Sequence, residues 1–135
     1  MRIRAYTPAD LEALERMHAQ QGFGYPFPDI ADPIFLSKLV VEDDAGRLVM
    51  AALVRLTSEV YLLLDPQAGT PVERWRRLLG LHAAAEREAL ARGLDDAHAF
   101  LPLQLERAFG RRLRRLGWVK DPWPAYCKKL GQGQT

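Results

Sequence analysis

The pattern of apolar and polar positions predicts strands and helices in alternation along almost the whole chain. Residues 2–6 alternate in a way that is typical of a half-buried strand. Thr7 and Pro8 then provide a helix N-cap and a first helical residue, and an apolar face repeats at three- and four-residue steps until Gly22. The chain is therefore predicted to begin with a strand and a helix.

Three apolar runs in the middle of the chain predict consecutive strands. The runs Ser37–Glu42 and Leu48–Leu56 flank the turn-forming residues 43–47, which is the pattern of an antiparallel hairpin. The run Val60–Leu64 has no polar alternation and ends at an Asp-Pro turn signal, so it predicts a strand buried on both faces. We expect these strands to form a meander.

A long helix is predicted to follow the meander. Thr70 is placed as its N-cap, Pro71 as its first residue and Glu73 as the partner of Thr70 in a capping box, while Gly93 marks its end. Its apolar face repeats at three- and four-residue steps and consists of Trp75, Leu78, His82, Ala85 and Ala89.

The last third of the chain adds a strand, a helix and a final strand. Residues 97–101 predict a short strand, and the order strand, helix, strand over 60–101 predicts a parallel pair with a right-handed crossover. An amphipathic helix over 105–116 and a strand at Tyr126–Leu130 follow. The elements together predict an α+β (α/β) fold.

Composition and charge narrow the class of protein. A chain of 135 residues with 48% hydrophobic residues is most simply one domain over 1–130 with a frayed tail at 131–135. No apolar run reaches the 18 residues that a membrane span needs, and residues 1–10 lack the apolar core of a secretory signal, so no such signal is expected. The single cysteine, Cys127, cannot form a disulfide framework. We expect a cytoplasmic protein with no membrane partner.

Acidic and basic residues are divided between the two halves of the chain. Residues 1–70 carry ten acidic against six basic side chains, whereas residues 71–135 carry thirteen basic against seven acidic ones. This division favours an anionic ligand for the second half and a cationic one for the first, or it arises by chance.

Residues 22–36 form an irregular segment rich in proline and aromatic residues. Two interpretations are open: Phe23, Tyr25 and Phe27 line a pocket with Asp29 and Asp32 at its rim, or the three rings cover one end of the core.

Three short stretches, in this order and at this spacing, carry a resemblance to a known family. They are the opening residues 3–11 (IRAYTPADL), the Leu-Asp-Pro at 64–66, and the Leu-Gly-Trp at 116–118. With the order of elements, this chain resembles the GNAT superfamily of acyl-CoA-dependent N-acyltransferases. The resemblance implies a three-layer fold, with helices on both faces of a mixed, mostly antiparallel sheet in which one parallel strand pair splays apart.

The resemblance also implies a place for acetyl-CoA. Its pantetheine arm would pair with the backbone of Leu62, Leu63 and Leu64, and its pyrophosphate would lie at the N-terminus of the long helix. A helix N-terminus attracts anions whatever the family, because its first N–H groups are unpaired and the helix dipole is positive there. The residues expected to hold the coenzyme also include Gly69, Thr70, Arg74, Arg76 and Arg77.

Three positions depart from the family pattern. Arg74 and Arg76 stand where the family usually has the glycines of its pyrophosphate loop, and Leu113 stands where it often has a tyrosine general acid. Either arginine side chains replace the backbone amides of the usual loop, or the fold has been kept while coenzyme binding has been lost.

Acyl transfer to an amine requires a base for the ammonium proton and an acid for the leaving thiolate. Glu59 is the base candidate, Tyr61 shares its face of the predicted strand, and Tyr126 is the replacement acid. Each has a structural alternative, namely a solvated charge or a core or rim tyrosine. No metal site is expected, because the three histidines have no ligand spacing: His18, His82 and His98.

Two functional hypotheses follow, with a third as a minor alternative. The first is an N-acyltransferase that acetylates a small-molecule or peptide amine; the second is a non-catalytic GNAT-like binding module without coenzyme. The third is contact between the Arg-rich helix around residues 111–115 and a phosphate backbone, but no nucleic-acid motif accompanies it and a solvated helix face is the commoner role. A homodimer stays open.

Overall fold

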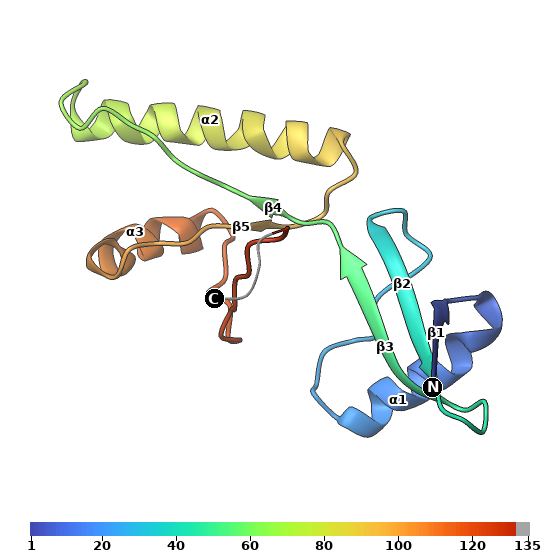
Figure 1. The fold of residues 1–135 in the computed structure, drawn as a ribbon. Coiled ribbons are helices and arrows are strands. Elements are labelled where there is room, and N and C mark those ends of the chain that lie inside the picture. Colours follow the sequence, from blue (N-terminus) through green and yellow to red (C-terminus); the bar gives the residue numbers. More distant parts are fainter. Residues whose placement is uncertain (132–135) are drawn as a thin grey trace. The chain divides into compact units, whose positions relative to one another are not determined.

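The structure, a computed structural model, describes residues 1–131 and has an α+β fold (Figure 1). The chain divides into two compact units, Met1–Ala99 and the residues from Phe100 on. The predicted frayed tail lies outside the described residues except for Gly131. In chain order the elements are β1 (Arg2–Ala5), the 3-10 helix η1 (Pro8–Asp10), α1 (Leu11–Gln21), β2 (Phe35–Glu42), β3 (Leu48–Arg55), β4 (Ser58–Glu59), α2 (Pro71–Ala91), β5 (Ala97–His98) and α3 (Leu103–Arg115).

The first unit contains a three-stranded antiparallel sheet in the order β1-β2-β3. Its hairpin turn is held by Asp43, whose N–H donates to the Arg47 carbonyl over 2.9 Å and whose carboxylate accepts the N–H groups of Ala45 and Arg47. Gly46 has a φ of 79°, which a residue without a side chain adopts at little cost. The predicted hairpin is thus confirmed, with β2 beginning two residues earlier than expected.

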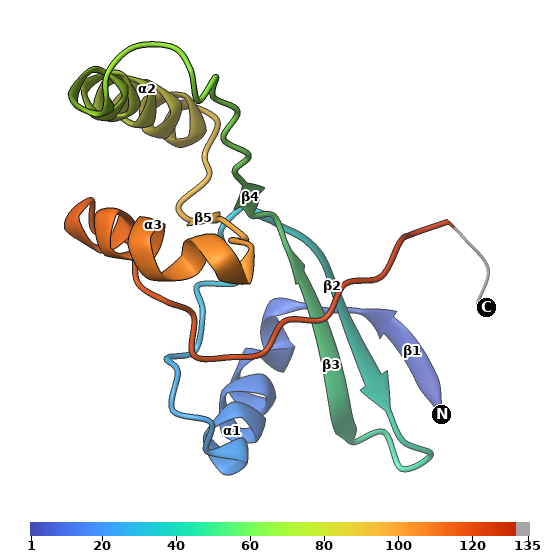
Figure 2. The ribbon, with the colours of Figure 1, turned by 90° about the vertical axis from the view of Figure 1, so that its left-hand side faces the viewer.

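A small core lies between this sheet and α1, which packs on one face of the sheet (Figure 2). Leu14 of α1, Ile30 of the connecting segment and Val40 of β2 are 4%, 3% and 0% exposed. Tyr6, Leu11, Met17, Phe27, Phe35, Leu48, Ala51 and Leu53 pack around them. The apolar face predicted for the first helix is the face that is buried.

The segment 22–34 mainly covers this core. Phe27 packs against the core, whereas Phe23 and Tyr25 stay about half exposed. Asp29 and Asp32 accept backbone N–H groups two residues further on, those of Ala31 and Ile34, and so shape local turns. These contacts support the interpretation as a core cover over the interpretation as a pocket wall.

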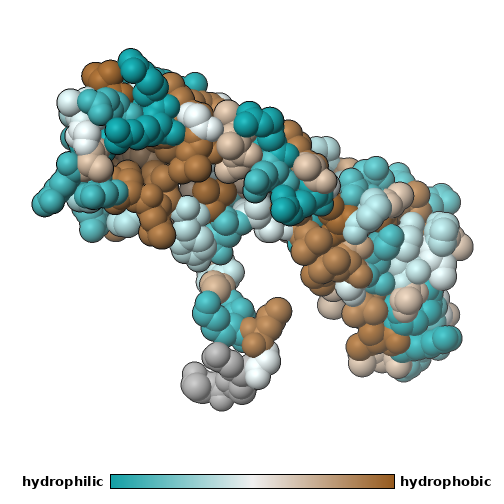
Figure 3. Space-filling view, turned by 90° about the horizontal axis from the view of Figure 1, so that it is seen from above, coloured by the Kyte–Doolittle hydropathy of each residue, from teal (hydrophilic) through white to brown (hydrophobic). Residues whose placement is uncertain are grey.

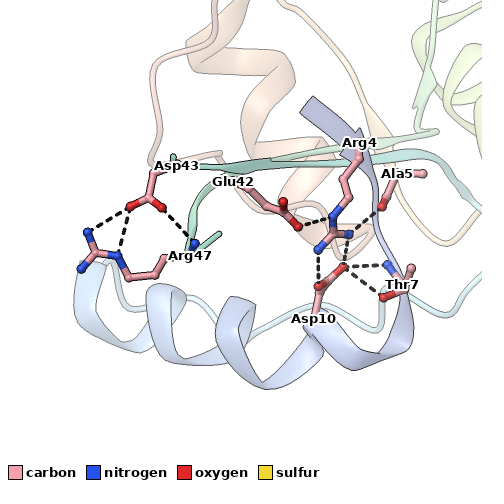
Figure 4. A network of polar contacts seen from close by, with 7 residues as sticks. All are labelled: Arg4, Ala5, Thr7, Asp10, Glu42, Asp43 and Arg47. Carbon is pink, nitrogen blue, oxygen red and sulfur yellow. Dashed lines mark hydrogen bonds and ion pairs between the residues drawn. The ribbon is translucent and has the colours of Figure 1, made fainter. Parts of the chain in front are cut away.

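A partly buried ion-pair network joins β1, η1 and β2 beside the core (Figure 4). Arg4 holds Asp10 through two parallel hydrogen bonds of 2.8 and 2.9 Å, and its Nε donates to Glu42 over 2.6 Å. The Asp10 carboxylate also accepts the Thr7 N–H over 2.8 Å. The Arg4 guanidinium and then the Thr7 N–H hold the pKa of Asp10 well below its usual range.

The predicted meander is wrong in its third strand. The chain leaves the antiparallel sheet after β3, and β4 pairs in parallel with β5 through Ser58–Ala97 and Glu59–His98. The parallel strand–helix–strand unit is confirmed, because α2 connects the two strands (Figure 1). The first of these strands, β4, precedes the predicted residues 60–64, and β5 ends at His98 instead of residue 101.

The long helix α2 begins and ends where the capping signals place it. Thr70 is its N-cap and Pro71 its first residue. At its other end the N–H groups of Gly93 and Leu94 donate to the carbonyls of Leu90 and Ala89, and Gly93 has a φ of 82°. Of the predicted apolar face, Trp75, Leu78, His82 and Ala89 are half-buried and Ala85 is exposed, and α2 contains no buried residue.

The second unit consists of α3 and an extended segment. The N–H of Trp118 donates to the Leu113 carbonyl over 3.0 Å, and Gly117 has a φ of 94°, so the predicted glycine stop is confirmed. The predicted strand Tyr126–Leu130 does not form, and Tyr126 is 99% exposed. No strand pairs with this segment among residues 1–131.

Candidate functional site

The site predicted to receive a coenzyme lies in the first unit, where the chain passes from β4 to α2. The last hydrogen bond of the parallel pair joins the Val60 N–H to the His98 carbonyl over 2.8 Å. Beyond it the pair is broken, and residues 61–65 form no strand. The chain then turns at residues 66–69 and enters α2 (Figure 1).

The buried strand predicted at Val60–Leu64 is therefore wrong. Leu63 is 90% exposed and Leu64 57%, and neither belongs to a sheet. A continuous apolar run indicates that side chains favour burial, but it does not specify a strand partner. Figure 3 shows brown, hydrophobic areas among the teal, hydrophilic ones on the surface.

The N-terminus of α2 has few unpaired donors left. Pro71 has no N–H, the Glu73 N–H donates to the Thr70 hydroxyl over 3.2 Å, and the Arg74 N–H donates to the Thr70 carbonyl over 2.9 Å. Within residues 1–131 only the Val72 N–H in this turn makes no hydrogen bond to the protein. The predicted capping box is half formed, because the Glu73 carboxylate contacts the Thr70 hydroxyl rather than its N–H.

Two of the three arginines at this helix start bind the loop before it. Arg74 donates to the Gly69 carbonyl over 2.8 Å and to the Pro66 carbonyl over 3.3 Å. Arg77 donates to the Ala68 carbonyl over 3.4 Å and to Glu73 over 3.3 Å. Carbonyl oxygens therefore compensate part of the repulsion between these cations and the positive end of the helix dipole.

Gly69 makes this arrangement of the arginines sterically feasible. Its φ of 78° is costly for a residue with a side chain, and a Cβ there would lie 2.9 Å from the Arg77 Nη1 and 3.0 Å from the Glu73 carboxylate. Arg76 differs from its neighbours, because its side chain is exposed and contacts no partner within the part of the chain that is described. An anion at this helix start would therefore meet the Val72 N–H and the Arg76 guanidinium.

The candidate catalytic residues lie in different parts of the chain. Glu59 is an exposed residue at the end of β4, and Tyr61, 78% exposed, follows the last bond of the parallel pair. Tyr126 belongs to the extended segment of the second unit. Their roles as base and acid stay predictions.

A polar cluster that no sequence pattern predicted stabilises the start of the parallel pair β4–β5. Asp96 accepts the Thr57 hydroxyl over 2.6 Å and the Arg55 guanidinium over 3.2 Å, and its carbonyl accepts the Ser58 hydroxyl over 2.7 Å. Arg55 also pairs with Asp95. Partial burial acts to raise the pKa of Asp96, but the hydrogen bonds from Thr57 and Arg55 outweigh it and lower that pKa.

The histidines do not gather into one site. His18 of α1 packs edge-to-face against Tyr25 and Phe27, with ring centroids 4.8 and 5.5 Å away. His98 of β5 lies 3.5 Å from the Asp96 carboxylate. Over residues 1–131, no three histidine, cysteine or acidic side chains come together as metal ligands would.

Comparison with known proteins assigns the chain to no family. No family model matches the sequence, and searches of the curated proteins and of the solved structures found no match. In the described part of the chain, no helix has the length and apolar character needed to cross a membrane. The class of protein is thus given by the α+β fold alone.

Proposed function

We propose that the chain is a GNAT-like N-acyltransferase that transfers an acetyl group from acetyl-CoA to a primary amine of a small molecule or peptide. In the reaction, the amine nitrogen attacks the thioester carbonyl, the carbon–sulfur bond breaks, and the ammonium proton passes to a base. Glu59 is the proposed base, and the leaving thiolate takes its proton from an acid.

The observation that carries this proposal is the early end of the parallel pair. After the bond between Val60 and His98, residues 62–64 make no backbone hydrogen bond within the described chain, and α2 begins seven residues further on. Unpaired N–H and C=O groups in an extended segment form the edge to which an amide-containing arm such as pantetheine adds like a further strand. The Arg76 side chain and the Val72 N–H offer positive potential for its phosphates.

Binding of acetyl-CoA to the full chain tests the first part of the proposal. Saturation at 100 times Kd stabilises a protein by about 2.7 kcal/mol, which a thermal-shift assay detects readily. Leu63→Pro removes one backbone donor from the proposed edge, whereas Leu63→Ala removes the same side chain and keeps the donor. We expect the proline variant to bind acetyl-CoA about 2–10-fold more weakly than the alanine variant, which is the range for one neutral hydrogen bond.

Arg76→Gln tests the phosphate contact, with Arg87→Gln as the matched control on an exposed position of α2. We expect only the first variant to weaken coenzyme binding. Turnover is followed as free thiol released from acetyl-CoA with a polyamine or a lysine-containing peptide as acceptor, and Glu59→Gln should slow it without changing the Kd for acetyl-CoA. Equal binding by all variants, or no thermal shift at millimolar acetyl-CoA, would refute the proposal.

A non-catalytic binding module is the second candidate, and a specific observation favours it. Arg74 and Arg77 bind loop carbonyls and the Thr70 hydroxyl takes the Glu73 N–H, so groups that would face a pyrophosphate are already engaged. This module would give no thermal shift with acetyl-CoA and no thiol release.

A further inference from the structure

Positive charge is concentrated in the second unit. Residues 1–99 carry fifteen acidic against eleven basic side chains, whereas residues 100–135 carry eight basic against two acidic ones. The boundary between the two compact units is therefore also a boundary of charge. A strongly basic unit of this size favours association with a polyanion.

Four arginines form a row along one face of α3. Residues 107, 111, 114 and 115 fall within an arc of about 100° on a helix with 3.6 residues per turn, and successive members four residues apart rise by about 6 Å. All four side chains are exposed, and within residues 1–131 none pairs with a carboxylate. The members of this arginine row are Arg107, Arg111, Arg114 and Arg115.

The acidic side chain of α3 does not neutralise the arginine row. Glu106, the acidic residue of α3, lies outside the arc and pairs with Lys120 of the following segment over 3.1 Å. The apolar positions Leu105, Phe109 and Leu113 occupy the opposite side of the helix. The arginine row therefore lies on the side of α3 that is opposite to its apolar side chains.

The segment after α3 adds exposed aromatic rings between lysines. Trp123 is 58% and Tyr126 99% exposed, and the chain here forms no strand. Lys120 precedes these rings and Lys128 and Lys129 follow them. The Lys120–Glu106 ion pair attaches the start of this segment to α3, so the rings and the arginine row belong to one small unit.

We propose that this unit binds single-stranded nucleic acid, with the arginine row on the phosphates and Tyr126 and Trp123 stacked on bases. Guanidinium groups bind phosphate oxygens bidentately and stay charged at all physiological pH values. Exposed aromatic rings favour a single strand over a duplex, because only unpaired bases offer their faces for stacking. The proposal is independent of the acyltransferase reaction.

The test uses the full chain and a fluorescent 20-nucleotide single strand of mixed sequence, followed by anisotropy between 50 and 200 mM salt. Four phosphate contacts predict a slope of log K against log salt of about −3, at about −0.7 per contact for single strands. Arg111→Gln combined with Arg115→Gln should halve this slope. Arg16→Gln combined with Arg87→Gln, at exposed helical positions of the first unit, should leave it unchanged.

The stacking contact is tested separately at Tyr126. Tyr126→Ala should weaken binding by about tenfold, within the range measured for one stacked base, whereas Tyr126→Phe keeps the ring and should bind like the wild type. Far-UV circular dichroism checks that each variant keeps its helices.

Several results would overturn the proposal. They are no binding at 50 mM salt, equal slopes for the two arginine pairs, tighter binding to the matched duplex than to the single strand, or equal affinity for polyglutamate. Retention by vesicles of anionic lipid in preference to the single strand would identify a membrane surface instead.

Discussion

The region of the β1–β3 sheet and α1 has a core in which Leu14, Ile30 and Val40 are almost completely buried. The helix α2 contains no buried residue, although it has 21 residues and α1 has 11. Both regions belong to the first unit. The sheet is stabilised by apolar burial and by the network around Arg4. The crossover through β4, α2 and β5 is held by hydrogen bonds to exposed or half-exposed groups, at Asp96 and at Thr70.

The two regions use arginine differently. The Arg4 side chain is mostly buried, and its guanidinium donates to carboxylates on two sides and to the Ala5 carbonyl. Arg74 is half-buried and Arg77 is exposed, and both bind backbone carbonyls of a short loop. Since solvent competes for exposed hydrogen bonds, the second arrangement can be exchanged for a ligand at low cost, while the first cannot.

The largest difference should appear when one leucine is truncated in each region. Leu14→Ala removes a core side chain and should lower the free energy of unfolding by about 2–5 kcal/mol. Leu63→Ala removes a side chain that is 90% exposed and should change it by no more than about 0.5 kcal/mol. Urea unfolding of the two variants measures both, and a comparable loss in each would show that residues 60–64 are buried.

The acid sensitivity of the sheet region should depend on Asp10. Because Arg4 and Thr7 depress the pKa of Asp10 in the folded protein, its contribution to stability is complete above its unfolded pKa of about 3.9. This contribution is lost as the pH falls from there toward the folded pKa. Asp10→Asn should therefore lower stability at pH 6 and reduce the further loss between pH 4 and pH 2.

Urea unfolding at several pH values checks this second prediction. Glu12→Gln is the matched control, because it removes an exposed carboxylate in the first turn of α1. If the control and Asp10→Asn show the same pH dependence, the network around Arg4 does not set the acid sensitivity.

Local sequence signals were sufficient to predict most of the helix ends. Glycine stops placed the ends of α1, α2 and α3, and Thr70 with Pro71 placed the start of α2, because each signal acts within a few residues of the helix end. The other two starts were not placed in this way, because Thr7 and Pro8 begin the 3-10 helix η1 and α3 begins without a side-chain cap. The hairpin β2–β3 was predictable for the same reason, since Asp43 and Gly46 determine its turn locally.

Long-range pairing was not predictable from the same patterns. Val60–Leu64 and Tyr126–Leu130 have strand-like composition, but a strand needs a partner and composition does not name one. The bonds from Arg4 to Glu42 and from Thr57 to Asp96 join residues 38 and 39 positions apart. No periodicity in a single sequence reveals such contacts.

At the candidate site, the N-cap of α2 was predicted from the sequence, whereas the contacts of the arginines were not. Thr70 and Pro71 were placed correctly by their residue types. The loop carbonyls that bind Arg74 and Arg77 carry no sequence signature, because every residue has a carbonyl.

Removing the N-cap of α2 should have a moderate effect on the stability of that helix. Thr70→Ala deletes the acceptor of the Glu73 N–H and should cost about 1 kcal/mol. Since α2 has no buried residue, this loss should appear as fraying of its first turn rather than as a shift of the whole transition. Hydrogen exchange of the first-turn amides should be faster in Thr70→Ala than in Thr70→Ser, which keeps the hydroxyl.

The most local effect, and the one that sharpens the contrast between the two arginine arrangements, is expected at Gly69. Gly69→Ala forces a side chain into a backbone with a φ of 78°, at a cost of about 1–2 kcal/mol, and its Cβ displaces the Arg77 guanidinium. Because that guanidinium is a flexible side-chain end, the strain should stay local to residues 66–70 and the urea midpoint of the β1–β3 sheet should not move. Gly46→Ala, with a φ of 79° and open space around it, is the matched control for backbone strain alone. If both variants accelerate hydrogen exchange of their own loops equally, the Arg77 contact adds nothing to the stability of the loop at residues 66–70. A larger acceleration in Gly69→Ala would measure the stability that the Arg77 contact contributes.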